Sequence, residues 1–160
     1  MLTRLLPGLG HLQNIHPLIV HFPIAFLLGS ALFYVAAWIF RRDSLSNTAF
    51  SMLMVGAISM AVAVGTGLYA EDGVMISRSV RENLLTKHKD LMLIASGLSW
   101  GLTLWAIAAR SFPSKGRVLF FLILLGLSGV LFYGADYGGR LVYDYNAGGD
   151  ACPQPIDFTK

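Results

Sequence analysis

The sequence predicts an all-α integral membrane protein, a four-transmembrane-helix up-down bundle with an irregular extracytoplasmic C-terminal tail. Of its 160 residues, 55% are hydrophobic and only 13% are charged. A soluble domain of this length has too little interior to bury so many apolar side chains. The apolar residues form four segments of about twenty residues, the length that crosses roughly 30 Å of hydrocarbon as a helix. We therefore expect one domain over residues 1–160, with the lipid bilayer as its solvent.

The predicted spans alternate with short polar segments. They cover roughly residues 17–40, 48–70, 88–109 and 117–137. Ser44 to Asn47 is expected to turn the chain after the first span, and Val74 to Lys87 to form a polar connector or short amphipathic helix. From Gly138 onward the tail is rich in Gly, Asp and Pro and is expected to be irregular. Because the connections are short, consecutive spans should run antiparallel, with the first and third diagonal in the bundle.

Basic residues indicate the orientation of the bundle, although the totals of Lys and Arg on its two sides are nearly equal. Two very short turns carry a dense group of cations, accompanied by a single acid, Asp43. These cations are Arg41, Arg42, Arg110, Lys115 and Arg117. Short loops rich in Lys and Arg stay in the cytoplasm. We therefore expect a multi-pass protein of the bacterial inner (cytoplasmic) membrane with both termini in the periplasm.

The entry to the first span combines two histidines with two prolines. Pro17 suits the first position of a helix, which leaves His16 at the cap. Pro23 lies inside the predicted helix, where it has no N–H to donate and clashes with the preceding turn. It should free the carbonyl of Ile19 and bend the helix beside His21.

Histidines are expected to gather at the periplasmic end, because the first and third spans enter the membrane from the same face. Histidine at the edge of the hydrocarbon is costly and usually faces protein, water or a metal. His21 and His88 lie at matched depth on diagonal helices, an arrangement in which a haem sits between two axial imidazoles. They are therefore predicted to hold the iron of one b-type haem. A structural role for both, as hydrogen-bonded residues, is equally compatible with the sequence.

His16 is a further candidate cofactor-binding residue. On one helix it would lie about 140° and about 7.5 Å from His21, so the two could share a metal only if the helix began after His16. A structural role as a helix cap is the favoured alternative. A zinc or copper site from His16, His21 and His88 lacks a supporting Cys or second His at metal-binding spacing.

The end of the fourth span carries glycines and one arginine. Gly134 and Gly138 form a small-xxx-small pair that allows a neighbouring helix to approach closely. Gly139 is expected to end the helix with a positive φ. Arg140 would then lie on the outer side, where a guanidinium can pair with a haem propionate. The alternative for Arg140 is an interfacial anchor flanked by two tyrosines.

Several of these stretches occur together in a known pattern. They are His16-Pro17-Leu18-Ile19-Val20-His21-Phe22-Pro23-Ile24-Ala25, Gly65-Thr66-Gly67-Leu68, His88, and Gly138-Gly139-Arg140-Leu141-Val142-Tyr143. Together they resemble a prokaryotic membrane family, domain of unknown function 2231. The resemblance covers nearly the whole chain and implies four transmembrane helices. Some relatives are joined to or near redox modules, which implies electron transfer, and no enzymatic activity carries over.

Two classes of function follow. The first is a membrane electron-transfer subunit with one non-covalent b-type haem near the periplasmic face, since the Cys-x-x-Cys-His attachment motif is absent. It would belong to a larger respiratory or redox complex and exchange electrons with membrane or periplasmic redox subunits, with quinone as a further candidate partner. The second is a haem-free anchor or assembly subunit that docks a periplasmic partner. Nucleic acid is not an expected partner, because the basic residues form no stripe. No Ser-His-carboxylate arrangement indicates catalysis.

Three expectations concern the ends of the chain. The Leu-rich segment Met1 to Gln13 is expected to lie along the membrane surface, with His11 as a surface residue. The single cysteine, Cys152, excludes an internal disulfide framework. It is expected either to pair with another chain or to be a free thiol in the tail.

Overall fold

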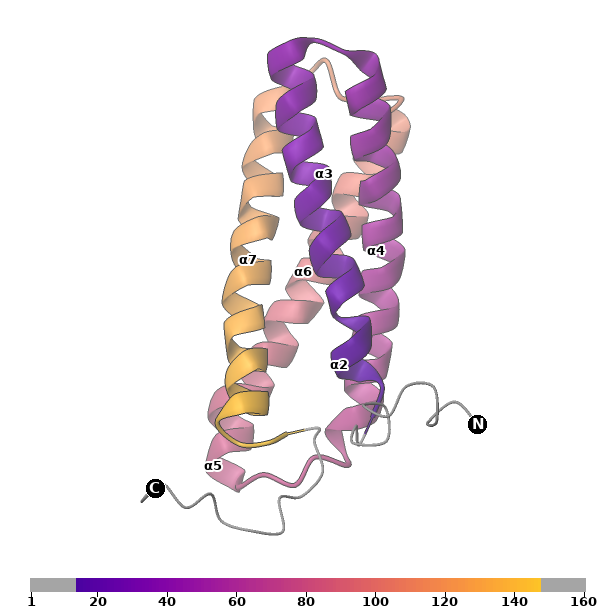
Figure 1. Cartoon of the computed structure of the whole chain (residues 1–160). Coiled ribbons are helices and arrows are strands. Elements are labelled where there is room, and N and C mark those ends of the chain that lie inside the picture. Colours follow the sequence, from indigo (N-terminus) through magenta and orange to yellow (C-terminus); the bar gives the residue numbers. More distant parts are fainter. Residues whose placement is uncertain (1–13, 148–160) are drawn as a thin grey trace, which may run out of the picture.

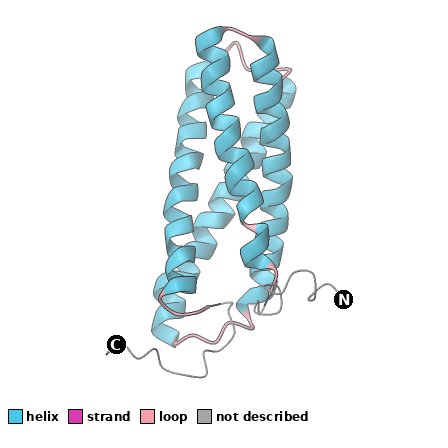
Figure 2. Ribbon diagram, viewed as in Figure 1, coloured by secondary structure: helices cyan, strands magenta, loops and turns pink. Residues whose placement is uncertain are grey.

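Four long helices run antiparallel to one another in the computed structural model, which describes residues 14–147 (Figures 1 and 2). The elements are α2 (His16–Ile19), α3 (His21–Phe40), α4 (Asp43–Glu71), α5 (Arg78–Val80), the π-helix η2 (Arg81–Leu85), α6 (Thr86–Ala108) and α7 (Arg117–Tyr143). The described residues contain no strand. Four of the helical segments are long and apolar enough to cross a membrane. The prediction of an all-α four-span bundle is therefore confirmed.

The helices follow one another around the bundle. α3 packs against α4, α4 against α6, α6 against α7, and α7 again against α3. The first and third spans are thus diagonal, as the short connections predicted. Fully buried small residues let the backbones approach, and Ser30 Oγ donates to the carbonyl of Ala49 at 2.9 Å. The hydrophobic effect does not drive helices together within lipid, so close packing of small residues stabilises the association of the helices instead.

The first span is interrupted at Val20, between α2 and α3. Pro23 has no N–H for the carbonyl of Ile19, and the next bond, from Ile24 N–H to Val20 O, is long at 3.5 Å. The structure thus interrupts the helix directly before His21, where the sequence predicted a bend.

Asn14, rather than His16, supports the start of α2. The Asn14 Oδ1 atom accepts a hydrogen bond from the backbone N–H of His16 at 3.1 Å. Ile15 occupies the cap position and His16 is the first helical residue. The alternative in which His16 acts as the helix cap is wrong, which leaves its imidazole available for other contacts.

Aromatic rings fill the end of the bundle at the α3–α4 and α6–α7 turns. Tyr34 is fully buried, and its ring centroid lies 5.1 Å from those of Phe112 and Phe120. Its hydroxyl donates to the carbonyl of Ser111 at 2.8 Å. The guanidinium of Arg117 lies 4.6 Å from the Phe112 centroid, a cation–π contact. These contacts join α3, the α6–α7 turn and α7 at this end, which we call the aromatic end.

Two predicted helix boundaries are wrong. α4 begins at Asp43, so Ser44 to Asn47 forms its first turn and not a loop; Arg41 reverses the chain in a left-handed conformation with φ 52°. α7 continues through Gly138 and Gly139 to Tyr143, and neither glycine has a positive φ. Glycine can stay helical here because a helix satisfies its own backbone groups in lipid, where an early end would leave them unpaired.

The connector between the second and third spans contains short helices, as predicted. α5 and η2 run directly into α6. Arg81 donates to the carbonyls of Glu71, at 3.2 Å, and Val74, at 3.0 Å, and so pins the connector to the end of α4. The predictions for Met1 to Gln13, His11 and Cys152 lie outside the described residues.

Candidate functional site

A cavity of about 340 Å³ lies at the end of the bundle opposite the aromatic end. Its walls come from α2, the last turns of α4, the start of α6 and the last turns of α7. Figure 1 shows α7 diverging from α3 and α2 toward this end. Most of the lining side chains are apolar, and the polar exceptions include His16, His88, Glu71 and Lys89. An apolar cavity with a few convergent polar groups is the usual form of a ligand site.

His16 is held against α4 by a side-chain hydrogen bond. Its Nδ1 atom lies 3.1 Å from Thr66 Oγ1. The Thr66 hydroxyl already donates its one proton to the carbonyl of Ala63 at 3.0 Å. Thr66 must therefore accept from His16, which assigns the imidazole proton to Nδ1. In the neutral ring, Nε2 then carries a free lone pair.

His88 is held against α7 in the same manner. Its Nδ1 atom lies 2.8 Å from the backbone oxygen of Gly134. A carbonyl oxygen can only accept, so Nδ1 is again the donor and Nε2 again carries the lone pair. A histidine fixed through one nitrogen by a carbonyl or hydroxyl has the form of a metal ligand with its supporting partner.

Two glycines, Gly67 and Gly138, leave the space that these imidazoles occupy. A Cβ atom on Gly67 would lie 2.9 Å from Cε1 of His16, and one on Gly138 would lie 2.9 Å from Cε1 of His88. Any other residue would push the ring away from its helix. The same packing therefore occurs twice in the bundle: His16 of α2 packs on Gly67 of α4, and His88 of α6 packs on Gly138 of α7.

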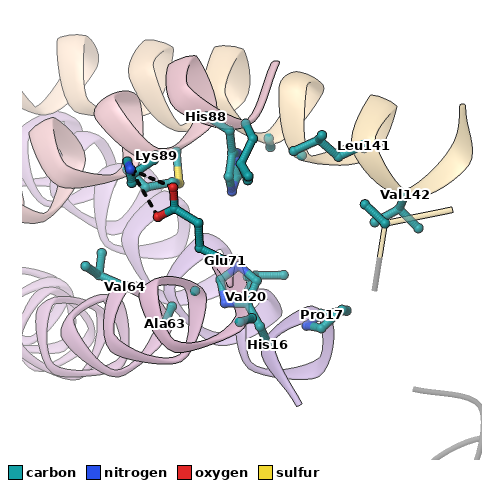
Figure 3. Close-up of a pocket in the computed structure, with 18 of the residues that line it drawn as sticks. His16, Pro17, Val20, Ala63, Val64, Glu71, His88, Lys89, Leu141 and Val142 are labelled. Atoms are coloured by element: carbon teal, nitrogen blue, oxygen red, sulfur yellow. Dashed lines mark hydrogen bonds and ion pairs between the residues drawn. The ribbon is translucent and has the colours of Figure 1, made fainter. Parts of the chain in front are cut away.

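The two imidazoles meet across the cavity. Their ring centroids are 6.4 Å apart and the ring planes are inclined by 76°. Figure 3 shows His88 extending from α6 toward the opposite wall, where His16 lies. Each ring is hydrogen-bonded through Nδ1, His16 to Thr66 and His88 to Gly134. The arrangement offers a pair of imidazole ligands that share one apolar space.

The structure brings His88 together with His16 and not with His21. The His21 ring borders the cavity but is exposed, and its Nδ1 atom lies 3.4 Å from the carbonyl of Leu18. The ring contact is thus between His16 and His88, and ligation of one iron by His21 and His88 stays a prediction that no ring contact supports. On a helix, His16 and His21 lie about 140° apart, and the hydrogen bond to Thr66 holds only His16 against α4.

Arg140 does not reach this cavity. It is exposed, its Nε lies 3.5 Å from Asp144 Oδ2, and it borders a separate depression together with Lys87 and Tyr137. The prediction that Arg140 faces a ligand beside the histidines is corrected by the length of α7. Because the helix continues, Arg140 lies about 200° around it from Gly138, which faces the cavity.

An ion pair that the sequence did not suggest lies in the cavity wall. Nζ of Lys89 is 2.8 Å and 3.0 Å from the two carboxylate oxygens of Glu71 (Figure 3). Glu71 ends α4, and Lys89 directly follows His88 in α6. The sequence could have indicated this pair, because Glu71 and Lys89 lie at the same predicted membrane level on consecutive antiparallel spans.

A metal site built from protein ligands alone is not formed by the described residues. They contain no group of three or more His, Cys, Asp or Glu side chains that could hold a metal ion. The zinc or copper alternative from His16, His21 and His88 therefore has no support among the described residues. Two imidazoles suffice only where the cofactor supplies the remaining ligands.

The fold and its cavity define a multi-pass membrane protein with a histidine-lined pocket near one end of its helices. The chain belongs to the DUF2231 family of predicted membrane proteins, whose family model matches residues 12–151. No curated protein and no solved structure matches the chain. The resemblance recognised from the histidine and glycine stretches is thus confirmed, and these stretches form the cavity.

Proposed function

We propose that this protein is an electron-transfer subunit that binds one non-covalent b-type haem between His16 and His88. The observation that carries the proposal is the 6.4 Å separation of the two ring centroids. With a metal–nitrogen distance of about 2.0–2.1 Å, two imidazoles that bind one ion from opposite sides have centroids roughly 6.3 Å apart. His16 and His88 would therefore be the residues that hold the iron.

The cavity favours a macrocycle over a bare ion. A bare zinc or copper ion needs further protein ligands, which the described residues do not bring together here. A porphyrin supplies four nitrogens itself and requires apolar space beside the axial ligands. The cavity of about 340 Å³, open along one side, offers such space for much of the ring.

Each part of the site has a role in this proposal. When bound, the haem supplies one-electron redox chemistry. Thr66 and the Gly134 carbonyl orient the imidazoles and raise their basicity as ligands. The apolar walls exclude water from the iron, which influences its potential.

The placement of the basic turns supports a position near the periplasmic face of the bacterial inner membrane, with both termini outside. The electron partners we propose are membrane or periplasmic redox subunits of a respiratory complex, with quinone as a further candidate. A haem-free subunit that anchors or assembles such a complex is the competing function.

Absorption spectroscopy of the purified protein, before and after addition of haem, tests the proposal. We expect a Soret band and a sharp reduced α-band typical of six-coordinate low-spin haem. His16→Ala and His88→Ala should each abolish the six-coordinate spectrum. His21→Ala is the matched control and should keep it. Folded wild-type protein that remains colourless with added haem would reject this function in favour of the anchor.

A further inference from the structure

A charged pair in the apolar cavity wall calls for an explanation. The side chains of Glu71 and Lys89 are only 22% and 32% exposed. Moving both charges away from water costs much of what their attraction returns, so such a pair is a weak source of stability. Charges kept at membrane depth more often mark a ligand or ion site.

The charge inventory of the cavity is small. Among the described residues that line it, Lys89 is the one Lys or Arg and Glu71 is the one Asp or Glu. Arg81, the nearest guanidinium along the connector, is occupied by the carbonyls of Glu71 and Val74. A negatively charged group on a ligand in this cavity would therefore meet Lys89 first.

Lys89 is also well placed relative to the imidazoles. It directly follows His88 in α6, so the ammonium and the proposed ligand come from the same helical turn. Its partner is already a carboxylate, held through two charge-assisted hydrogen bonds of 2.8 Å and 3.0 Å. A carboxylate on a ligand offers the same chemistry as Glu71.

We propose that Lys89 binds a free carboxylate of the molecule that occupies the cavity, and that Glu71 competes with that carboxylate for the ammonium. This inference rests on the proposed haem site and identifies its ligand as a macrocycle with free carboxylate groups. Two carboxylates on one ammonium repel each other, so Glu71 is displaced when the ligand enters. Glu71 can turn to the aqueous side because it is the last residue of α4.

The test compares two probes, iron protoporphyrin and its dimethyl ester, in which both carboxylates are blocked. Dissociation constants are measured by Soret titration of the full chain in detergent. Lys89→Gln should weaken binding of iron protoporphyrin roughly 10- to 100-fold, the loss expected for a charge-assisted contact. Binding of the dimethyl ester should change less than about twofold, which also shows that the variant is folded. Glu71→Gln should tighten binding of iron protoporphyrin alone.

Lys87→Gln is the matched control. Lys87 lies two residues earlier on the same helix, but it is exposed above the Tyr137 ring and outside the cavity. This variant should bind both probes like the wild type. Arg140→Gln should do the same.

The outcomes separate the two proposals. Wild-type protein that binds neither probe rejects the haem site itself. Wild-type protein that binds both probes, together with a Lys89→Gln variant that binds iron protoporphyrin equally well, rejects only the role of Lys89. Equal losses for both probes in Lys89→Gln also reject that role, since the effect would then not depend on a carboxylate. An unchanged Glu71→Gln affinity overturns the competition by Glu71.

Discussion

The two ends of this bundle use the same four helices in opposite ways. At the aromatic end, large rings such as Tyr34 and Phe120 are fully buried and fill the centre. At the other end, glycines and small residues line the helices, and the centre is an apolar cavity beside His16 and His88. Dense packing stabilises a protein interior, whereas a cavity costs free energy in proportion to its size. The comparison shows that large buried rings are concentrated at one end, whereas the other end encloses an apolar cavity.

The largest effect should come from opening the aromatic end. Tyr34→Ala removes a fully buried ring from between Phe112 and Phe120, which we expect to cost about 3 kcal/mol. The thermal midpoint in detergent should fall by roughly 6–12 °C, measured by circular dichroism. Haem affinity measured well below the midpoint should stay near that of the wild type. A loss of haem binding in a folded sample would show that the two ends are not independent.

Adding a methyl group at Gly67 or Gly138, where the imidazoles pack, should have the next largest effect. The effect should be on haem affinity and not on thermal stability. Gly67→Ala and Gly138→Ala each place a methyl group against an imidazole, and a displaced ligand should weaken haem binding about 100-fold. Thermal stability should be equal or higher, because alanine favours helix over glycine by about 0.5–1 kcal/mol.

Gly97→Ala provides the matched control for the Gly67→Ala and Gly138→Ala variants. A Cβ atom at Gly97, in α6, would meet nothing within 4 Å. This variant should keep the wild-type spectrum and affinity. If this variant loses haem like the other two, the loss arises from a change in the helix backbone and not from displacement of an imidazole.

Removing the partner of one imidazole should have a smaller effect. Thr66→Val keeps the shape of the side chain but removes the oxygen that accepts from His16 Nδ1. The freed ring should lose orientation, and haem affinity should fall about tenfold. Thr66→Ser restores the hydroxyl and should restore most of the affinity. Equal haem affinities in Thr66→Val and Thr66→Ser would mean that this hydrogen bond does not help His16 to bind haem.

The smallest effect concerns a single hydrogen bond at the aromatic end. Tyr34→Phe keeps the ring contacts but leaves the carbonyl of Ser111 without its donor. We expect a loss of about 1 kcal/mol in stability and no change in haem affinity. The thermal midpoint gives the first quantity and a Soret titration gives the second. A loss as large as that of Tyr34→Ala would assign the stability of this end to the hydrogen bond instead of to ring packing.

The spans, their antiparallel order and the break near Pro23 could all be predicted from the sequence. These features depend on local chemistry, namely the length of an apolar run, short connections and the missing N–H of proline. The same logic correctly predicted that His16, His21 and His88 lie at one end of the bundle. It failed at Ser44 to Asn47, because polar residues are as compatible with the first turn of a helix as with a loop.

The partner of His88 was decided only by the tertiary structure. Depth along the first span favoured His21, but the direction of the α2 turn depends on packing against Thr66 and Gly67, about fifty positions away in the chain. The position of Arg140 likewise depended on whether α7 ended at Gly139 or continued to Tyr143. The Glu71–Lys89 pair required the register between α4 and α6.

The sequence by itself therefore determined which residues reach the open end, since helix length and topology set depth in the membrane. Only the tertiary structure determined which of them face one another, because rotation about a helix axis is set by contacts between distant segments.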